Sequence, residues 1–233
     1  MPSSSQTAQG TGNEILLGEV SPRILAKRKR TGFILRIAGT LCLVAALGIG
    51  GYMAWLLWGT GITTSRAQTE LKAQILERIE TPRPSVVPED PAAPVSVSFS
   101  LGEPMAILRI PRIGLDMVVV EGSDTENLKK GPGHYPDTAY PWEESGRVAI
   151  AGHRTTYGQP FWSLDELRKG DLIRVVTEFG RFDYRVTRLR VVLPTDGWVL
   201  EQTDRPTLVL TTCTPRFTAS RRLIVFAALA AEG

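Results

Sequence analysis

The sequence predicts an all-β fold: a closed or nearly closed barrel of seven or eight strands with short helices, preceded by one transmembrane helix. Three observations predict the barrel. Short runs rich in Val, Ile and Leu recur after residue 104, turn-forming compositions separate them, and no long helical segments alternate with them. Closing the sheet buries such runs without leaving open edges. The predicted strands are 106–110, 117–120, 147–152, 172–176, 182–193, 207–212 and 222–229.

An uncharged segment near the N-terminus predicts the membrane helix. Residues 37–58 contain no charged side chain. At 1.5 Å per residue a helix of this length reaches roughly 33 Å, which is enough for a hydrocarbon core of about 30 Å. A cleaved signal peptide is the alternative, but its apolar region is usually only about 7 to 15 residues long. Because Trp55 and Trp58 also suit a membrane interface, we favour a retained anchor.

The charges beside this segment predict its orientation. Basic residues are concentrated before it, and the only basic residue among the next twelve is Arg66. The positive-inside rule then places the N-terminus in the cytoplasm and the remainder of the chain outside, as a single-pass protein of the cell membrane. The net charge of +3 does not indicate a nucleic-acid partner, because topology and contact with the lipid bilayer explain the basic cluster. Those residues are Arg23, Lys27, Arg28, Lys29, Arg30 and Arg36.

The chain divides into four predicted segments. Residues 1–36 form a cytoplasmic segment, disordered and then basic, and residues 37–58 form the transmembrane helix. Residues 59–103 hold an amphipathic juxtamembrane helix at 65–80 and a linker with five prolines between 82 and 94. We expect this linker to hold the β-barrel domain, residues 104–233, away from the membrane. Short helical turns are predicted at 124–130 and 161–170.

Cys213 is the residue that first indicates chemistry. The only other cysteine, Cys42, lies in the predicted span, so Cys213 is predicted to be a free thiol in the exported domain. A lone cysteine is often buried and inert, but polar residues at other strand ends favour a reactive one. His153 follows one predicted strand and can act as a general acid or base, while Arg222 begins another and can bind an oxyanion. Thr211 and Thr212 precede the cysteine at the same end of its strand.

The stretches "TLVLTTCTPRFTASRRLIV" and "AIAGHRTTYGQPFWSLDELRKGD" resemble the sortase family over residues 104–233, and "GHRTTYG" and "TCTPRF" most resemble the class E sortases of actinobacteria. The resemblance implies a sortase-type barrel with Cys213 as nucleophile, His153 as general acid or base and Arg222 as the residue that stabilises the oxyanion or positions the substrate. Arg222 is preferred to Arg221 because it directly precedes "LIV" and because adjacent strand residues point to opposite faces. Predicted substrate-binding residues are Thr211, Thr212, Tyr157 and His134, the last as a loop residue that shapes the groove rather than as the catalytic base.

The implied reaction is transpeptidation. Cys213 cleaves an LPXTG-like or LAXTG-like sorting signal of an exported protein between Thr and Gly, and an amine of a peptidoglycan precursor or pilin subunit then takes the acyl group. No cofactor or metal is expected, because Asp137, Glu143 and Glu144 are interpreted as solvated loop charges. Two alternatives remain: a membrane-anchored cysteine peptidase that transfers the acyl group to water, and a non-catalytic β-barrel adhesin or scaffold with an inert thiol. The S-H-G-C-type motif of L,D-transpeptidases is absent.

Overall fold

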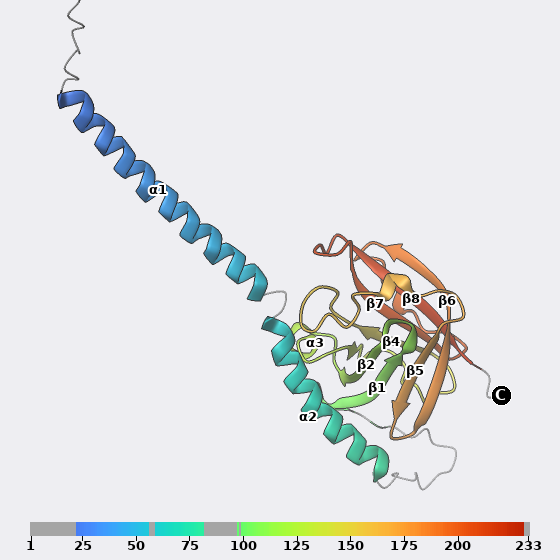
Figure 1. Cartoon of the computed structure of the whole chain (residues 1–233). Helices are drawn as coiled ribbons and strands as arrows, with labels where there is room; N and C mark the ends of the chain where they lie inside the picture. Colours follow the sequence, from blue (N-terminus) through green and yellow to red (C-terminus); the bar gives the residue numbers. More distant parts are fainter. Residues whose placement is uncertain (1–21, 56–58, 82–96, 98, 231–233) are drawn as a thin grey trace, which may run out of the picture. The chain divides into compact units, whose positions relative to one another are not determined.

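The computed structural model describes residues 22–55, 59–81, 97 and 99–230 (Figure 1). The chain divides into two compact units, residues 1–51 and residues 52–233, and each is described by itself. The predicted proline-rich linker at 82–94 and the predicted disordered start of the chain lie outside the described residues.

The first unit is formed largely by helix α1 (Pro22–Ala54). Within it, residues 33–54 are long and apolar enough to cross a membrane, and none of this stretch is buried inside the protein. Exposed apolar side chains over such a length are typical of a lipid-facing helix rather than of a core helix. The candidate span therefore begins four residues before the predicted boundary at 37, and residues 56–58 lie outside the described part of the chain.

The second unit contains eight strands that close into a barrel in the order β1-β2-β3-β4-β7-β8-β6-β5. All seven predicted runs are strands, so the predicted all-β barrel is confirmed. The eighth strand, β3, was not predicted; it has two residues and pairs with β2 and β4. The strands are β1 (Pro104–Ile110), β2 (Leu115–Glu121), β3 (Gly133–His134), β4 (Arg147–Ala151), β5 (Leu172–Thr177), β6 (Gly180–Val192), β7 (Thr207–Thr214) and β8 (Arg221–Leu229).

Short helices lie in the connections. The predicted turns at 124–130 and 161–170 contain α3 (Thr125–Leu128) and the 3₁₀ helix η3 (Leu164–Glu166). The Asp124 side chain caps α3 by accepting the backbone N–H groups of Glu126 and Asn127. Two further 3₁₀ helices are η2 (Pro111–Ile113) and η4 (Gly197–Leu200).

Alternating residues of the strands form two separate apolar clusters. Leu208 and Leu210 of β7 belong to the main cluster, to which the other long strands also contribute, so this cluster fills the barrel. Val209, between them, packs outside the barrel with Ile224 and with Trp198 of η4. This two-residue period decides which side chains of β4, β7 and β8 lie on the outer face.

Helix α2 (Thr60–Glu80) packs against β1 and β2. Its buried Leu71 and Ile75 contact a third apolar cluster that includes Ile107 and Val118. The Gln68 side chain also accepts the Val118 N–H at 2.7 Å and donates to the Val118 carbonyl at 3.0 Å, so it satisfies the backbone of β2 as a neighbouring strand would.

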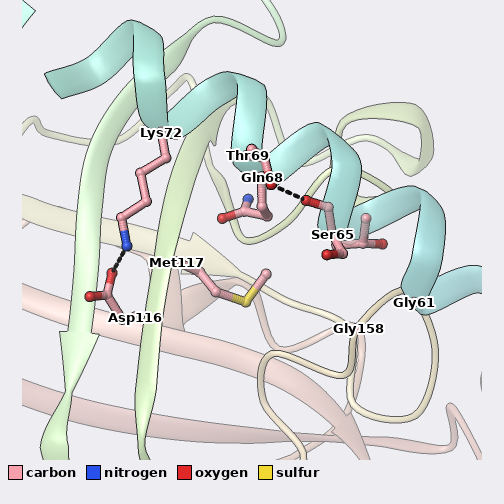
Figure 2. Close-up of a pocket in the computed structure, with 9 residues that line it drawn as sticks. Gly61, Ser65, Gln68, Thr69, Lys72, Asp116, Met117 and Gly158 are labelled. Carbon is pink, nitrogen blue, oxygen red and sulfur yellow. Dashed lines mark hydrogen bonds and ion pairs between the residues drawn. The ribbon is translucent and has the colours of Figure 1, made fainter. Parts of the chain in front are cut away.

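The neighbouring surface of α2 borders a pocket of about 320 Å³ against β2, where Lys72 pairs with Asp116 at 3.1 Å (Figure 2). The helix was expected at 65–80, in a segment separate from a domain that starts at 104. It begins at Thr60 and belongs to the same compact unit as the barrel.

Candidate active site

The three candidate catalytic residues lie at one level across three adjacent strands. In the antiparallel pair of β7 and β8, Cys213 is directly opposite Arg222. In the parallel pair of β4 and β7, Ala151 is opposite Thr211, and the next N–H, that of Gly152, donates to the Thr211 carbonyl at 3.1 Å. Two residues beyond Ala151 and Thr211 are His153 and Cys213. The register thus brings the histidine and the arginine to opposite sides of the cysteine.

The period of the strands also places Cys213 and Arg222 on the same face. Leu210 and Leu223 point into the barrel, whereas Val209 and Ile224 pack outside it. Side chains two or four positions along a strand share a face, so Cys213 lies on the outer face with Val209, and Arg222 lies there with Ile224. Arg221 pairs with Thr214, and both belong to the alternate set of positions, whose side chains point inward along the strands. Arg221 is exposed at the end of β8 and lies on the opposite face from the cysteine.

The Cys213 side chain is a half-buried free thiol at the end of β7. Such a position leaves the sulfur accessible from the outer face, unlike that of a cysteine packed within the barrel. The other cysteine, Cys42, is a free thiol in α1.

His153 is half-buried immediately after β4. Its Nε2 atom is buried and has no hydrogen-bond partner among the described residues. Burial lowers the pKa of His153 below its ordinary value of 6.5, because it disfavours the imidazolium form. At neutral pH the ring is therefore mainly neutral, with an unpaired nitrogen that can exchange a proton with a nearby group.

The glycine before this histidine is required by close packing. A Cβ atom added at Gly152 would lie 2.6 Å from the ring of Phe161, which is closer than real Cβ contacts. The Phe161 N–H also donates to the His153 carbonyl at 3.1 Å and closes the loop between them. The Gly-His step thus allows Phe161 to pack under the end of β4.

Arg222 is held by the loop between β7 and β8. Its Nη1 atom donates to the carbonyls of Ala219 at 2.9 Å and Arg221 at 3.2 Å. Among the described residues Nε and Nη2 have no acceptor, so they are available to an oxygen bound beside Cys213. A guanidinium fixed at one nitrogen and open at the others can stabilise negative charge that develops during a reaction.

The two threonines predicted to bind substrate are both occupied by protein partners. The Thr212 hydroxyl donates to the Gly152 carbonyl at 2.7 Å, and this side chain, 3% exposed, belongs to the inward series. It has no surface for a substrate, and instead it ties β7 to the residue before His153. The Thr211 hydroxyl lies on the outer face, 5% exposed, and bonds to the Tyr135 hydroxyl at 3.1 Å.

His134 is not a loop residue that shapes a groove. It lies in β3 with no exposed surface, and its Nδ1 donates to Glu121 Oε2 at 3.0 Å. Its Nε2 lies 3.1 Å from both the Ala139 carbonyl and the Thr138 hydroxyl. The side chain has no access to a substrate, and its contacts instead stabilise the connection between β3 and β4.

Tyr157 lies beside His153, with ring centroids 5.0 Å apart and ring planes inclined at 37°. Its backbone N–H donates to the hydroxyl of Thr60, which is in the first turn of α2. The sequence offered no sign of this contact, because the partners are 97 positions apart.

Two further residues of the site were not identified from the sequence. Tyr135 bonds to Thr211 on the outer face, and Arg154 bonds to the Thr214 hydroxyl at 2.9 Å and to Asp165 at 2.8 Å. Arg154 directly follows His153, and Thr214 directly follows Cys213. Their hydrogen bond therefore joins the two chain segments beside the candidate catalytic residues. Tyr135 directly follows His134, and Arg154 lies in the "GHRTTYG" stretch directly after His153, so their positions beside candidate residues were the only sequence signal. Within the described part of the chain, no group of three or more His, Cys, Asp or Glu side chains is arranged to hold a metal ion.

Comparisons with known proteins match the barrel region of the chain. Residues 108–230 match the family model described as a sortase domain. Sortase D of Bacillus subtilis is 32% identical over 174 residues, which cover 74% of this chain and 86% of that protein. Sortase SrtE1 of Streptomyces coelicolor is 35% identical over 150 residues, which cover 58% of this chain and 43% of that protein. The solved structure of a Clostridium perfringens Sortase D5 transpeptidase matches with a TM-score of 0.61 at 30% identity, over 71% of this chain and 99% of that one.

Proposed function

The chain belongs to the sortase family of cysteine transpeptidases, and from this premise we propose that it cleaves LPXTG-like or LAXTG-like sorting signals of exported proteins between Thr and Gly. The acyl group is then transferred to an amine of a cell-wall precursor or a pilin subunit. The observation that carries this proposal is the register of β4, β7 and β8, which sets His153 and Arg222 on either side of the half-buried Cys213 thiol.

In the first half of the reaction the Cys213 sulfur attacks the threonine carbonyl carbon. The new C–S bond converts the carbonyl oxygen to an oxyanion, and the open N–H groups of Arg222 donate to it. The C–N bond to glycine then breaks, and His153 gives the departing amine the proton that it took from the thiol. The products are a thioester on Cys213 and a free C-terminal fragment.

In the second half the acceptor amine attacks the thioester carbonyl. Its nitrogen loses a proton to the neutral His153, the C–S bond breaks, and the sulfur regains the proton as the thiol is restored. One amide bond is exchanged for another, so the reaction needs no external energy source. The lowered pKa of His153 favours the neutral ring that this half requires.

The outer face of β7 and β8 is covered by protein except near the end of the strands. Val209 and Ile224 are buried, with Trp198 and Tyr135 packed against them. An extended peptide is therefore expected to bind at the strand end, where the half-buried Cys213 lies opposite Arg222.

The cellular location is part of the proposal. The apolar stretch at 33–54 anchors the protein as a single-pass helix, and the basic residues that precede it favour an N-terminus in the cytoplasm. The barrel then lies on the outer side, where exported proteins and cell-wall amines are found.

The test is mass spectrometry of the full-length protein in detergent after mixing with a panel of LPXTG and LAXTG peptides. We expect an acyl adduct on Cys213 that disappears with the Cys213→Ala variant, and a ligated product that forms when an amine is added. Hydrolysis at a rate and yield unaffected by the amine would favour a cysteine peptidase. Absence of an adduct with every peptide, together with unchanged attachment of surface proteins in cells that carry only Cys213→Ala, would favour a non-catalytic barrel.

A further inference from the structure

We propose that the first turn of α2 is part of the catalytic apparatus: Thr60 fixes the backbone of Tyr157, and the Tyr157 ring in turn positions the imidazole of His153. Thr60 and Tyr157 are then positioning residues, which act through the histidine without touching the scissile bond. This inference rests on the proposed role of His153 as general acid and base.

The contact between α2 and the loop after His153 is well buried. The Tyr157 N–H donates to the Thr60 hydroxyl at 3.0 Å, and Thr60 is 8% exposed. One turn further on, Thr64 is 1% exposed and its hydroxyl donates to the Lys129 carbonyl at 2.7 Å. The same end of the helix thus binds two separate loops of the barrel, and Figure 2 shows Gly61 of α2 beside Gly158 of the first loop.

The backbone of this loop needs such support. Tyr157 has φ 52°, Gly158 has φ 73° and Gln159 has φ 52°, so three consecutive residues adopt the left-handed region. Residues with a Cβ atom disfavour that region, and they keep it only where the surroundings hold them there. Thr60 supplies one such constraint through its hydrogen bond to the Tyr157 N–H. Thr64 supplies a second by close packing, because a Cβ atom at Gly158 would lie 3.2 Å from the Thr64 methyl group.

The Tyr157 ring is what orients the imidazole. Its centroid is 5.0 Å from that of His153, and no hydrogen bond of the imidazole is found within the described residues. In many sites a hydrogen bond to the second ring nitrogen sets the orientation of a functional histidine. Here ring packing takes that place, so a movement of Tyr157 changes both the direction and the burial of the Nε2 atom.

The site therefore extends across the connection from α2 to the barrel. Thr60 begins the helix, whose side chains pack on β1 and β2 at the buried Leu71 and Ile75. The helix is fixed to the sheet by these contacts, and the sheet also carries β4, which ends at the histidine. Thr60 thus holds Tyr157 in the same rigid frame as His153.

The experiment compares two matched pairs of variants in the full-length protein. Thr60→Val removes the acceptor and keeps the shape, whereas Thr60→Ser keeps the acceptor. Tyr157→Leu removes the ring, whereas Tyr157→Phe keeps it. Each variant is measured for thermal unfolding, for kcat and KM with a sorting peptide that acylates the parent enzyme, and for the pH titration of His153 by NMR of ¹³C-histidine-labelled protein. Two histidines in the chain make the spectrum assignable with a His153→Gln reference.

We expect Thr60→Val and Tyr157→Leu to lower kcat by about tenfold or more, since a displacement of about 1 Å in a catalytic group can lower the rate about 10²-fold. Their KM should stay within about twofold, and the His153 pKa should rise toward 6.5 as the ring loses cover. Thr60→Ser and Tyr157→Phe should resemble the parent in all three measurements. If Thr60→Val does not fold, the Tyr157 pair alone decides the result.

Three outcomes would overturn the inference. Unchanged kcat and His153 titration in folded Thr60→Val and Tyr157→Leu would show that neither residue positions the ring. A lower melting temperature with unchanged kcat would show a purely structural contact. A raised KM at unchanged kcat would show that Tyr157 binds the peptide instead. The proposed function fails separately, when the parent enzyme forms no adduct on Cys213, and the NMR titration still tests the contact in that case.

Discussion

Replacing Thr212 with valine removes the hydroxyl that joins the strands of the nucleophile and the histidine. That hydroxyl donates to the Gly152 carbonyl at 2.7 Å, one residue before Cys213 on one side and one residue before His153 on the other. Valine has nearly the same shape, so the change leaves the carbonyl without its donor while creating no cavity. We expect both stability and turnover to fall.

The size of the loss follows from burial. Thr212 is 3% exposed and Gly152 is also buried, so water does not easily replace the missing donor. Leaving a buried carbonyl unpaired costs roughly 1 to 3 kcal/mol, and a domain of this size loses about 2 to 4 °C of melting temperature per kcal/mol. About 2 kcal/mol and about 6 °C are therefore expected. Because the carbonyl borders His153, kcat should fall while KM changes little.

Thermal unfolding and peptide transpeptidation of the full-length protein check this, with Thr212→Ser as the matched control that retains the donor. The serine variant should resemble the parent in kcat and should lose only the stability of one buried methyl group, about 1 kcal/mol. A raised KM at unchanged kcat in Thr212→Val would refute the reasoning, since it would mean that the hydroxyl contacts substrate. Parent-like stability together with parent-like kcat would refute it equally.

Three further substitutions test other parts of the structure. Arg222→Ala should lower kcat by about 10²-fold or more in a peptide assay, because an oxyanion donor is lost. Arg221→Ala, on the opposite face of the strand, should keep kcat within about twofold of the parent, and equal losses in the two variants would contradict the role of Arg222. His153→Gln should gain stability relative to the parent as the pH falls from 7 to 5. Because the pKa of His153 is lowered in the folded protein, the unfolded parent binds more protons than the folded parent below about pH 6.5, and the parent loses stability there. Melting temperatures of parent and variant that fall in parallel would contradict this. His134→Leu should destabilise the protein by about 3 kcal/mol in urea unfolding, because it removes the His134 donor from the buried Glu121 carboxylate. A raised KM in the folded variant would instead support substrate contact.

The strands could be predicted because each is marked by its own residues. Seven runs of Val, Ile and Leu between turn residues correspond to seven of the eight strands. The missed strand, β3, consists of Gly133 and His134, which have no β-forming pattern and lie within a turn-like stretch. It forms because β2 and β4 supply its hydrogen-bond partners. A local sequence pattern cannot indicate strands that are distant in the sequence.

The choice of Arg222 over Arg221 as the residue on the face of Cys213 depended on a local rule. Adjacent strand residues point to opposite faces, so the sequence sufficed to separate the two arginines. No such local rule reveals the partners of His134 and Thr212. Their side chains are polar and close to the motif, but Glu121 and Gly152 occupy them inside the protein. Nothing in the spacing indicates which polar groups are already paired.

By itself, the sequence determined the apolar helix near the N-terminus, the β-barrel, and the set of cysteine, histidine and arginine that indicates the family. These features follow from residue type and from periods of two or a few positions, which act within one element. Only the tertiary structure decided that α2 belongs to the barrel unit and that Thr60 contacts Tyr157. Such contacts join segments up to 97 positions apart, and they arise from the packing of the whole chain, which no local pattern encodes.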